Sequence, residues 1–500
     1  MTLLPVIRRA GVLIALAATS LTHAQTPPAL SAVALPVFPG TVLRLTDFGA
    51  VGDGRTLNTE AFAKAIETLS GKGGGELDVP PGLWLTGPIK LRSNIKLHLE
   101  RGALIQFSRD YTLYPLTVID LKGEKEVDST SPISGVNLEN VAITGEGIID
   151  GGGDAWRPLK YDKLSARDWK ALVKSGGVLN EAGDTWYPGR AVITGAKLVE
   201  NLRAHGSLTL ADYEPAHQFL RPKMLRIIGC KKLLLQGVTF ENPPNWTMNP
   251  VLCEDVSLLN VTVHNLPTAQ NSDALDVESC RRAVIRGCTF DTGDDGICIK
   301  SGKDDAGRRI GVPTEDVLVE GCTVYHAHGG FTIGSEMSGG VRNLVVTNCT
   351  FLGTDIGLRF KSTRGRGGVV ENIFISDIRM VGITGDAISF SMAYGGKSPL
   401  EDTADVDTNF PPVTEATPQF RAIHIENVIC RGAQSAMALA GLPELPLRDI
   451  TFKNVSITSQ KGVSVRDAEN LTFENVQVAS QTGPALKTFR VLHSRLELTP

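Results

Sequence analysis

The sequence predicts an all-β protein whose chain winds into a right-handed parallel β-helix. From Leu233 onward, short segments of alternating apolar and polar residues end in Gly, Asn or Asp, and most neighbouring copies lie 21 to 34 residues apart. The segments are rich in β-branched residues and alternate with period two, whereas helical repeats of similar length follow a period of 3.6. Each copy therefore corresponds to one coil of a solenoid whose strands stack through backbone hydrogen bonds.

In each copy of the repeat, a turn residue is followed by an apolar residue or a cysteine. The copies contain Gly237-Val238, Asn260-Val261, Gly287-Cys288, Gly321-Cys322, Asn348-Cys349, Asp377-Ile378, Asn427-Val428, Asn454-Val455 and Asn475-Val476. Equivalent residues on successive coils of a stacked sheet lie about 4.8 Å apart. Residues one repeat apart in the sequence are therefore expected to be neighbours in space.

The repeat also assigns most of the eight cysteines. Cys288, Cys322 and Cys349 share one position of the repeat. Cys230, Cys253 and Cys280 share another. We expect them to point inward as stacks of small apolar side chains rather than to form bridges, although stacked thiols lie close enough for a disulfide. The sequence contains no CxxC or Cys/His spacing typical of zinc, so we predict no metal and no cofactor.

The first 24 residues have the features of a secretory signal peptide. Arg8 and Arg9 precede an apolar run over 10–21, and small residues follow at a candidate cleavage site. The run is too short for a membrane span, which needs about 20 residues. We therefore expect an exported protein, periplasmic or extracellular, with no membrane partner after cleavage. With a net charge of −4, nothing in the composition indicates nucleic-acid binding.

After a linker over 25–44, residues 45–500 are expected to form one β-helix domain. A short amphipathic helix over 58–69 is expected to cap the open end of the solenoid. Insertions at about 152–221 and 395–418 interrupt the repeat. The first contains a helix from Ser165 to Lys174, with Ser165 and Asp168 as a capping box.

Each coil has a second strand, and aligning these strands brings polar residues together. The aligned pairs are Leu275/Val277, Ile297/Ile299, Phe331/Ile333, Leu358/Phe360 and Ile388/Phe390. Under this register, Asp273 stacks on Asp295 and Asp294 stacks on His328. Arg359 and Lys361 reach the same patch from a later coil. Independent surface charges would not be expected to converge in this way.

Three carboxylates at this spacing raise one another's pKa and titrate as a coupled set. One can stay protonated as an acid while the others act as base, which is the division of labour that glycosidic hydrolysis needs. A guanidinium beside an ammonium group suits the binding of a substrate carboxylate. The patch therefore contains the groups that glycosidic hydrolysis needs, beside cations that suit a carboxylate.

Four segments resemble, in order, the signatures of the polygalacturonase family, glycoside hydrolase family 28. They are Asn271-Ser272-Asp273, Gly293-Asp294-Asp295, His328-Gly329 and Arg359-Phe360-Lys361. The resemblance begins at about Leu45, includes residues 47–54, and is greatest to bacterial exo-polygalacturonases. It implies a pectin-lyase-like β-helix that hydrolyses α-1,4-galacturonosidic bonds in pectin or polygalacturonate with inversion. Its partner would be a pectic polysaccharide or an oligogalacturonide.

The resemblance also implies a role for each matched residue. Asp294 would be the general acid, supported by His328, while Asp273 and Asp295 would position and deprotonate the attacking water. The remaining matches would bind substrate, and they are Arg359, Lys361, Asn271 and Tyr394. Ala327 and Phe360 replace the family's usual Gly and Ile, and neither replacement removes a chemical group.

Other functions remain open at this point. They are a rhamnogalacturonan hydrolase of the same family, a calcium-dependent eliminase of the pectate-lyase type, and a non-catalytic β-helix that binds polysaccharide. Within the favoured function, the insertion at about 152–221 suggests a hypothesis. A bulky segment near one end of an open groove would block it and convert endo cleavage to exo trimming.

Overall fold

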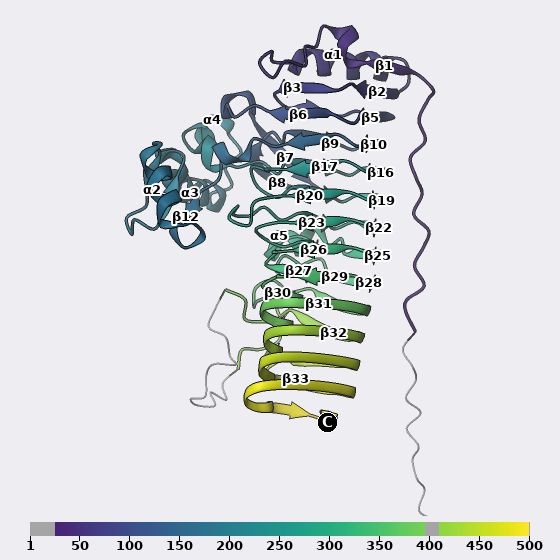
Figure 1. The fold of residues 1–500 in the computed structure, drawn as a ribbon, viewed down its shortest axis with the longest axis vertical. Helices are drawn as coiled ribbons and strands as arrows, with labels where there is room; N and C mark the ends of the chain where they lie inside the picture. Colours follow the sequence, from purple (N-terminus) through teal and green to yellow (C-terminus); the bar gives the residue numbers. More distant parts are fainter. Residues whose placement is uncertain (1–25, 396–409, 500) are drawn as a thin grey trace, which may run out of the picture.

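The computed structural model describes residues 26–395 and 410–499, and it shows the right-handed parallel β-helix that the repeat predicts (Figure 1). The predicted signal peptide at 1–24 and residues 396–409 of the second predicted insertion lie outside the described residues. Each coil contributes strands to three faces, and every strand pairs in parallel with its equivalent on the next coil. The stack of coils therefore forms a column with one continuous core.

The strands follow one another down the three faces of the column. The first face contains β2 (Gly75–Val79), β5 (Ile95–Leu99), β10 (Glu139–Gly145), β16 (Lys231–Gln236), β19 (Glu254–Leu259), β22 (Arg281–Arg286), β25 (Thr314–Glu320) and β28 (Val341–Thr347). The second contains β3 (Gly82–Thr86), β6 (Ala103–Phe107), β11 (Ile148–Asp150), β17 (Thr239–Glu241), β20 (Thr262–His264), β23 (Thr289–Asp291), β26 (Thr323–Tyr325) and β29 (Thr350–Leu352). The third contains β4 (Ile89–Lys90), β9 (Ile133–Val136), β15 (Leu225–Ile228), β18 (Met248–Val251), β21 (Leu275–Glu278), β24 (Ile297–Lys300), β27 (Gly329–Ile333) and β30 (Ile356–Lys361).

In the last coils, single long strands curve through all three faces. These are β31 (Val369–Ser391), β32 (Gln419–Ala440) and β33 (Leu447–Leu492). At the other end, β1 (Val42–Arg44) pairs with β2, so part of the predicted linker joins the sheet. The rest of that segment runs along the outside of the column, where the Ala34 amide donates to Asp255 Oδ1 at 3.2 Å.

The repeated turn residue has a conformational reason. All nine, from Gly237 to Asn475, have φ between 51° and 77°. This left-handed region is open to glycine and tolerated by Asn and Asp. Asparagine side chains at this position also bond down the column, since Asn454 Nδ2 donates to Asn427 Oδ1 at 3.2 Å and Asn475 Nδ2 donates to Asn454 Oδ1 at 2.9 Å. The turn thus fixes where each coil restarts.

Inside the column, equivalent side chains stack on one another. The rings of Phe360 and Phe390 are parallel with centroids 4.1 Å apart, and Phe420 packs edge-on against both. All eight cysteines are buried and free. In one predicted stack, the Cys230 amide lies 3.4 Å from Cys253 Sγ, and the Cys253 amide lies 3.4 Å from Cys280 Sγ. The interpretation of these cysteines as inward stacks is therefore confirmed.

The predicted capping helix is α1 (Thr59–Gly71), which covers the first coils with Phe62, Ile66 and Leu69 buried. No helix among the described residues is both long and apolar enough to span a membrane.

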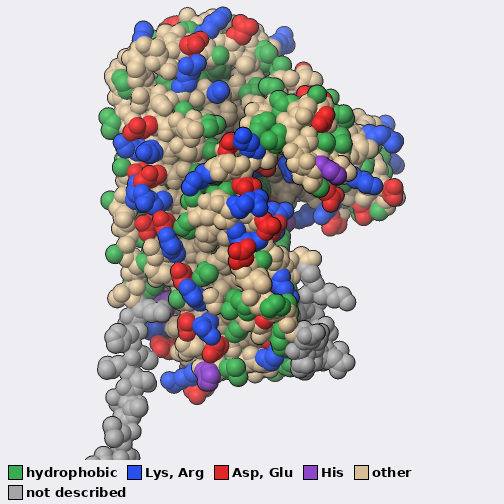
Figure 2. Space-filling view, turned by 180° about the vertical axis from the view of Figure 1, so that it is seen from behind, with side chains coloured by type: hydrophobic (Ala, Val, Ile, Leu, Met, Phe, Trp, Pro, Cys, Tyr) green, Lys and Arg blue, Asp and Glu red, His purple; other side chains and the backbone are tan. Residues whose placement is uncertain are grey.

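A lobe projects from one flank of the column. It contains α2 (Ala166–Lys174), α3 (Arg190–Ala204), α4 (Leu210–Tyr213), the 3-10 turn η5 (Glu214–Phe219) and a small antiparallel sheet of β12 (Leu159–Lys160), β14 (Thr185–Tyr187) and β13 (Val178–Leu179). Ser165 caps α2 by accepting from the Asp168 amide, as predicted. Sequence analysis did not predict α3 or the hairpin of β7 (Leu116–Leu121) and β8 (Glu124–Ser129). Figure 2 shows, from behind, a recess where the lobe overhangs the column.

The stacked core makes a prediction about stability. Phe420 and Ile429 both lie on β32, but Phe420 is fully buried whereas Ile429 is 53% exposed. Phe420→Ala should lower the free energy of unfolding by about 3–5 kcal/mol, because removal of the ring leaves a cavity that the neighbouring stacked rings cannot fill. Ile429→Ala is the matched control and should change it by about 0.5 kcal/mol or less. Chemical denaturation followed by circular dichroism measures both, and equal losses would contradict the stacked core.

Candidate active site

The predicted register is observed on the third face. Leu275 pairs with Ile297, Ile297 with Phe331, Phe331 with Leu358, and Leu358 with Ile388. Asp273 therefore occupies the same column as Asp295, just before the amino ends of β21 and β24. The amide following Asp273 donates to the Asp295 carbonyl at 2.9 Å, and the His328 amide donates to the Asp294 carbonyl at 3.0 Å. Both predicted stacks are thus present.

The three aspartates come together but differ in exposure. Carboxylate oxygens of Asp273, Asp294 and Asp295 all lie within 4.8 Å of one another. Asp273 is 4% exposed and Asp295 is fully buried, whereas the side chain of Asp294 is 18% exposed. Asp294 is therefore the member of the cluster that best reaches a molecule in solution.

Asp295 is surrounded by hydrogen-bond donors. Lys361 Nζ lies 2.6 Å from Oδ2, and Arg359 Nη1 lies 3.0 Å from Oδ1. Thr332 Oγ1 donates to Oδ1 at 3.2 Å. Burial alone would raise the pKa of Asp295, but the neighbouring cations, Lys361 first, outweigh it and hold that pKa well below its usual range. Asp295 is therefore the ionised member of the cluster.

Asp273 is in the opposite state. Burial raises the pKa of Asp273 well above its usual range, and the charges of Asp294 and Asp276 add to the shift. Its Oδ1 is buried without a hydrogen-bond partner in the structure. In the unliganded cluster, a shared proton therefore rests most favourably on Asp273.

Asp294 is paired with a histidine. His328 Nδ1 lies 3.2 Å from Asp294 Oδ1, and His328 Nε2 lies 3.7 Å from Asp355 on the other side of the ring. The hydrogen bond to Asp294 raises the pKa of His328 and outweighs the opposing effect of burial. Asp294 Oδ1 also accepts from the Asp295 amide at 3.0 Å, so its orientation is set from two sides.

A buried ion cluster lies beside the carboxylates, and sequence analysis did not assign it to the site. Lys300 Nζ lies 3.4 Å from Asp276 and 2.9 Å from Glu336, and it also lies 4.4 Å from the ring centre of Trp246. Burial raises the pKa of Asp276 to about 7, although Lys300 opposes that shift. A signal was present, because Asp276 and Lys300 place charges in strands that also contain the apolar residues Leu275, Val277, Ile297 and Ile299.

Asn271 is oriented by a residue at the end of the insertion. Arg221 Nη2 donates to Asn271 Oδ1 at 2.7 Å, and Nη1 donates to the carbonyls of Pro244 and Gln270 at 3.3 and 3.4 Å. Because the amide oxygen of Asn271 accepts from Arg221, its NH2 group is left to donate elsewhere. Sequence analysis did not identify Arg221, since nothing in the repeat pattern relates it to residue 271.

Tyr394 lies beside the two predicted carboxylate-binding cations. Its ring centre is 5.1 Å from Lys361 Nζ and 5.7 Å from Arg359 Cζ, and the residue is 41% exposed. These three residues line a cavity of about 220 Å³ together with Asp386 and Ser389. Every residue that the sequence predicted for the site is thus gathered on one flank of the column.

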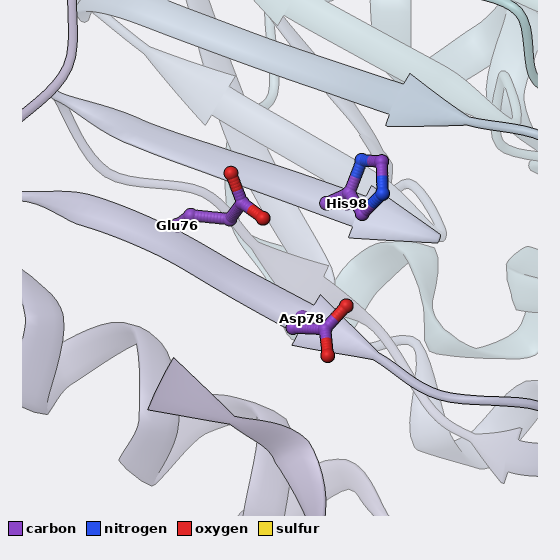
Figure 3. A group of neighbouring side chains, drawn as sticks. All are labelled: Glu76, Asp78 and His98. Carbon is purple, nitrogen blue, oxygen red and sulfur yellow. The ribbon is translucent and has the colours of Figure 1, made fainter. Parts of the chain in front are cut away.

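Two groups among the described residues have the spacing to share a metal ion, and the aspartate cluster is one of them. The other lies far away on β2 and β5, where Glu76 and Asp78 point out from one strand and His98 from the next (Figure 3). In that group, Lys96 pairs with Glu76 at 2.7 Å and Arg44 lies 3.6 Å from Asp78. Because a protein cation already contacts carboxylates in both groups, neither is assigned a metal.

Comparison with known proteins identifies similar sequences. A sequence model described as "Glycosyl hydrolases family 28" matches residues 211–490. A probable polygalacturonase from Vitis vinifera is 28% identical over 423 residues, which cover 83% of this chain and 73% of the relative. An exo-poly-alpha-D-galacturonosidase from Dickeya chrysanthemi is 27% identical over 368 residues, covering 71% of this chain and 57% of the relative. The match thus spans little more than half of that relative.

The fold and sequence also match a solved structure. The crystal structure of a hyperthermoactive exopolygalacturonase from Thermotoga maritima superimposes with a TM-score of 0.75 at 34% identity. The match covers 89% of this chain and 94% of that one.

The pairing of His328 with Asp294 makes a prediction about titration. Asp294→Asn should lower the pKa of His328, because the carboxylate that stabilises the imidazolium is removed. Nuclear magnetic resonance of the labelled histidine ring measures this pKa, with His326 as an internal control because it pairs instead with Asp291. The raised pKa means that the pair stabilises the fold most below about pH 6.5, and that this contribution is lost as the pH rises through the folded-state pKa. An unchanged His328 titration would show that Asp294 does not control it.

Proposed function

This chain belongs to glycosyl hydrolases family 28, and we propose that it hydrolyses α-1,4-galacturonosidic bonds in polygalacturonate and pectin. The observation that carries the proposal is the convergence of three carboxylates beside two cations with spare donors, where the pKa of Asp273 is raised and that of Asp295 is lowered. From the predicted signal peptide at 1–24, we infer that the enzyme acts outside the cytoplasm.

Asp294 is proposed as the general acid. It is the most exposed of the three carboxylates, so it can reach the glycosidic oxygen of a bound chain. Its oxygen is held by His328 and by the Asp295 amide, which fixes the direction in which a proton is delivered. A general acid must carry a proton, and the raised pKa of the neighbouring Asp273 lets that residue hold one within 4.8 Å of Asp294.

Asp295 and Asp273 are proposed to activate the attacking water. Both oxygens of Asp295 accept hydrogen bonds from side chains, and the residue is fully buried, so it is poorly placed to attack an anomeric carbon itself. A water molecule is therefore the attacking group, which gives inversion. The carboxylate spacing is closer than the roughly 6.5–9.5 Å typical of inverting pairs, and the proposal of inversion rests on the engagement of Asp295 instead.

Arg359 and Lys361 are proposed to bind the carboxylate of a galacturonate. Each gives a donor to Asp295, but a guanidinium has five donors and an ammonium has three, so both keep donors for a ligand. Tyr394 adds an exposed ring beside them. A pair of cations favours an acidic sugar over neutral rhamnose at this position. Asn271, whose amide oxygen accepts from Arg221, is proposed as a further donor to the substrate through its NH2 group.

The enzyme is further proposed to act from a chain end. The support is the lobe that projects from one flank of the column, and the similarity to proteins named as exo-acting. An exo-enzyme releases monomer or dimer with little early loss of viscosity, whereas an endo-enzyme lowers viscosity rapidly.

The proposed acid is tested by substitution. Asp294→Asn should lower kcat on de-esterified polygalacturonate by about 10²–10⁴-fold with little change in KM, because the proton donor is lost while the binding groups remain. Asp291→Asn is the matched control, since Asp291 lies three residues earlier and pairs with the exposed His326. A reducing-end assay measures both variants. Retention of most activity in Asp294→Asn would remove this residue from the mechanism.

The stereochemistry of the product tests the role of water. Inversion predicts that the new reducing end formed from an α-linked chain is initially the β-anomer. Proton nuclear magnetic resonance detects this anomer before mutarotation. Release of the α-anomer would mean a covalent intermediate on a carboxylate. An eliminase would instead give unsaturated products that absorb in the ultraviolet and depend on calcium, and a non-catalytic binding protein would release no new chain ends.

A further inference from the structure

We call the outer surface of the third face beside the aspartates the substrate groove. Its floor can be followed from the aspartates toward the amino-terminal coils. Pairing of Leu225 with Met248, and of Met248 with Leu275, continues the column of Asp273 backwards. Four consecutive coils contribute to it, and the residues are Lys223, Trp246, Asp273 and Asp295. With coils about 4.8 Å apart, Lys223 lies about 10 Å from Asp273. Trp246 fills the step between them, with its ring centre 5.5 Å from Lys223 Nζ.

The next step of this floor is covered by the β7–β8 hairpin. Asp128 accepts from Lys223 Nζ at 3.2 Å and from Arg226 Nη1 at 3.3 Å, and Glu126 accepts from Arg226 Nη2 at 3.0 Å. Arg226 and Asp128 are each 5% exposed, although Arg226 points outward from β15. The hairpin therefore covers the third face of the column at this coil. It also neutralises Lys223 and Arg226, which would otherwise meet a substrate carboxylate.

The hairpin is fixed at both ends. Near its base, Leu116 and Val127 share a small core with Val199 of α3 and residues of α4 and η5. At its tip, Arg309 of α5 (Asp304–Ile310) makes two bonds to Glu124, at 2.7 and 2.8 Å. A cavity of about 1090 Å³ is lined by the hairpin and by residues at the carboxyl ends of β9, β15, β18 and β21, whereas the aspartates lie at the amino ends of their strands.

We propose that the β7–β8 hairpin is the closed end of the substrate groove, and that it sets the exo mode of the function proposed above. The space over Trp246 holds the terminal galacturonate. A longer chain on that side meets a bonded wall whose carboxylates, Glu126 and Asp128, repel a further uronate and already accept hydrogen bonds from Lys223 and Arg226. The distal part of the lobe, including α2, is not part of this wall, and no residue of α2 is buried.

Two deletions separate these parts of the chain. Leu116 and Ser129 pair across the hairpin, so a Gly-Ser link can replace residues 117–128. Lys160 and Thr185 pair across the small sheet, so the same link can replace residues 161–184 and remove α2. The double substitution Glu126→Gln with Asp128→Asn serves as a second hairpin variant that keeps the backbone intact. Thermal unfolding confirms that each variant folds.

Product sizes from de-esterified polygalacturonate, read by anion-exchange chromatography, decide the outcome. Wild type and the α2 deletion should release only monomer or dimer, whereas both hairpin variants should release longer oligomers from the first minutes and lower viscosity faster. Folded hairpin variants that still release only the short product, or oligomers from the α2 deletion, would overturn the inference while leaving hydrolysis intact. Early oligomers from wild type would overturn the exo mode and this inference together. No hydrolysis by wild type would overturn the proposed function itself.

Discussion

The whole molecule depends on the register with which one coil stacks on the next. A left-handed turn residue restarts each coil at the same place, and side chains inside the column then stack on their equivalents. The same register brings Asp273 against Asp295 and Asp294 against His328 on the outside. A slip of one residue would turn every inward side chain outward, so the core itself enforces the alignment of the site.

Placing three carboxylates within 4.8 Å of one another is costly unless their charges are balanced. The balance here is uneven. Lys361 and Arg359 bind Asp295 directly, so its pKa falls, while Asp273 is buried without such a partner and its pKa rises. One cluster thus contains an ionised and a protonated carboxyl group before any substrate arrives. That difference in state, rather than the number of aspartates, is what acid–base chemistry requires.

The sequence predicts those parts of the structure that follow from periodicity. The strand register, the cysteine stacks and the convergence of the polar residues all come from a repeat of fixed pattern. The contacts that the sequence does not predict join segments that do not belong to the repeat. Arg226 and Glu126 are 100 residues apart, and Arg309 and Glu124 are 185 apart. The hairpin, α3, Arg221 and the bonds of Lys300 belong to this second class, because only the folded chain brings their partners together.

The two classes of contact correspond to two levels of function. The groups proposed to surround the scissile bond are held by consecutive coils, and Asp295 receives its donors from the outward residues of β27 and β30. The segments that bound the groove are held by contacts that join non-repeating parts of the chain to the coils, such as the bonds from Lys223 and Arg226 to the hairpin. Changes in the hairpin can therefore alter where along a polymer the enzyme acts without disturbing the carboxylates. Changes in the coils cannot, because the same strands carry both the core and the charges.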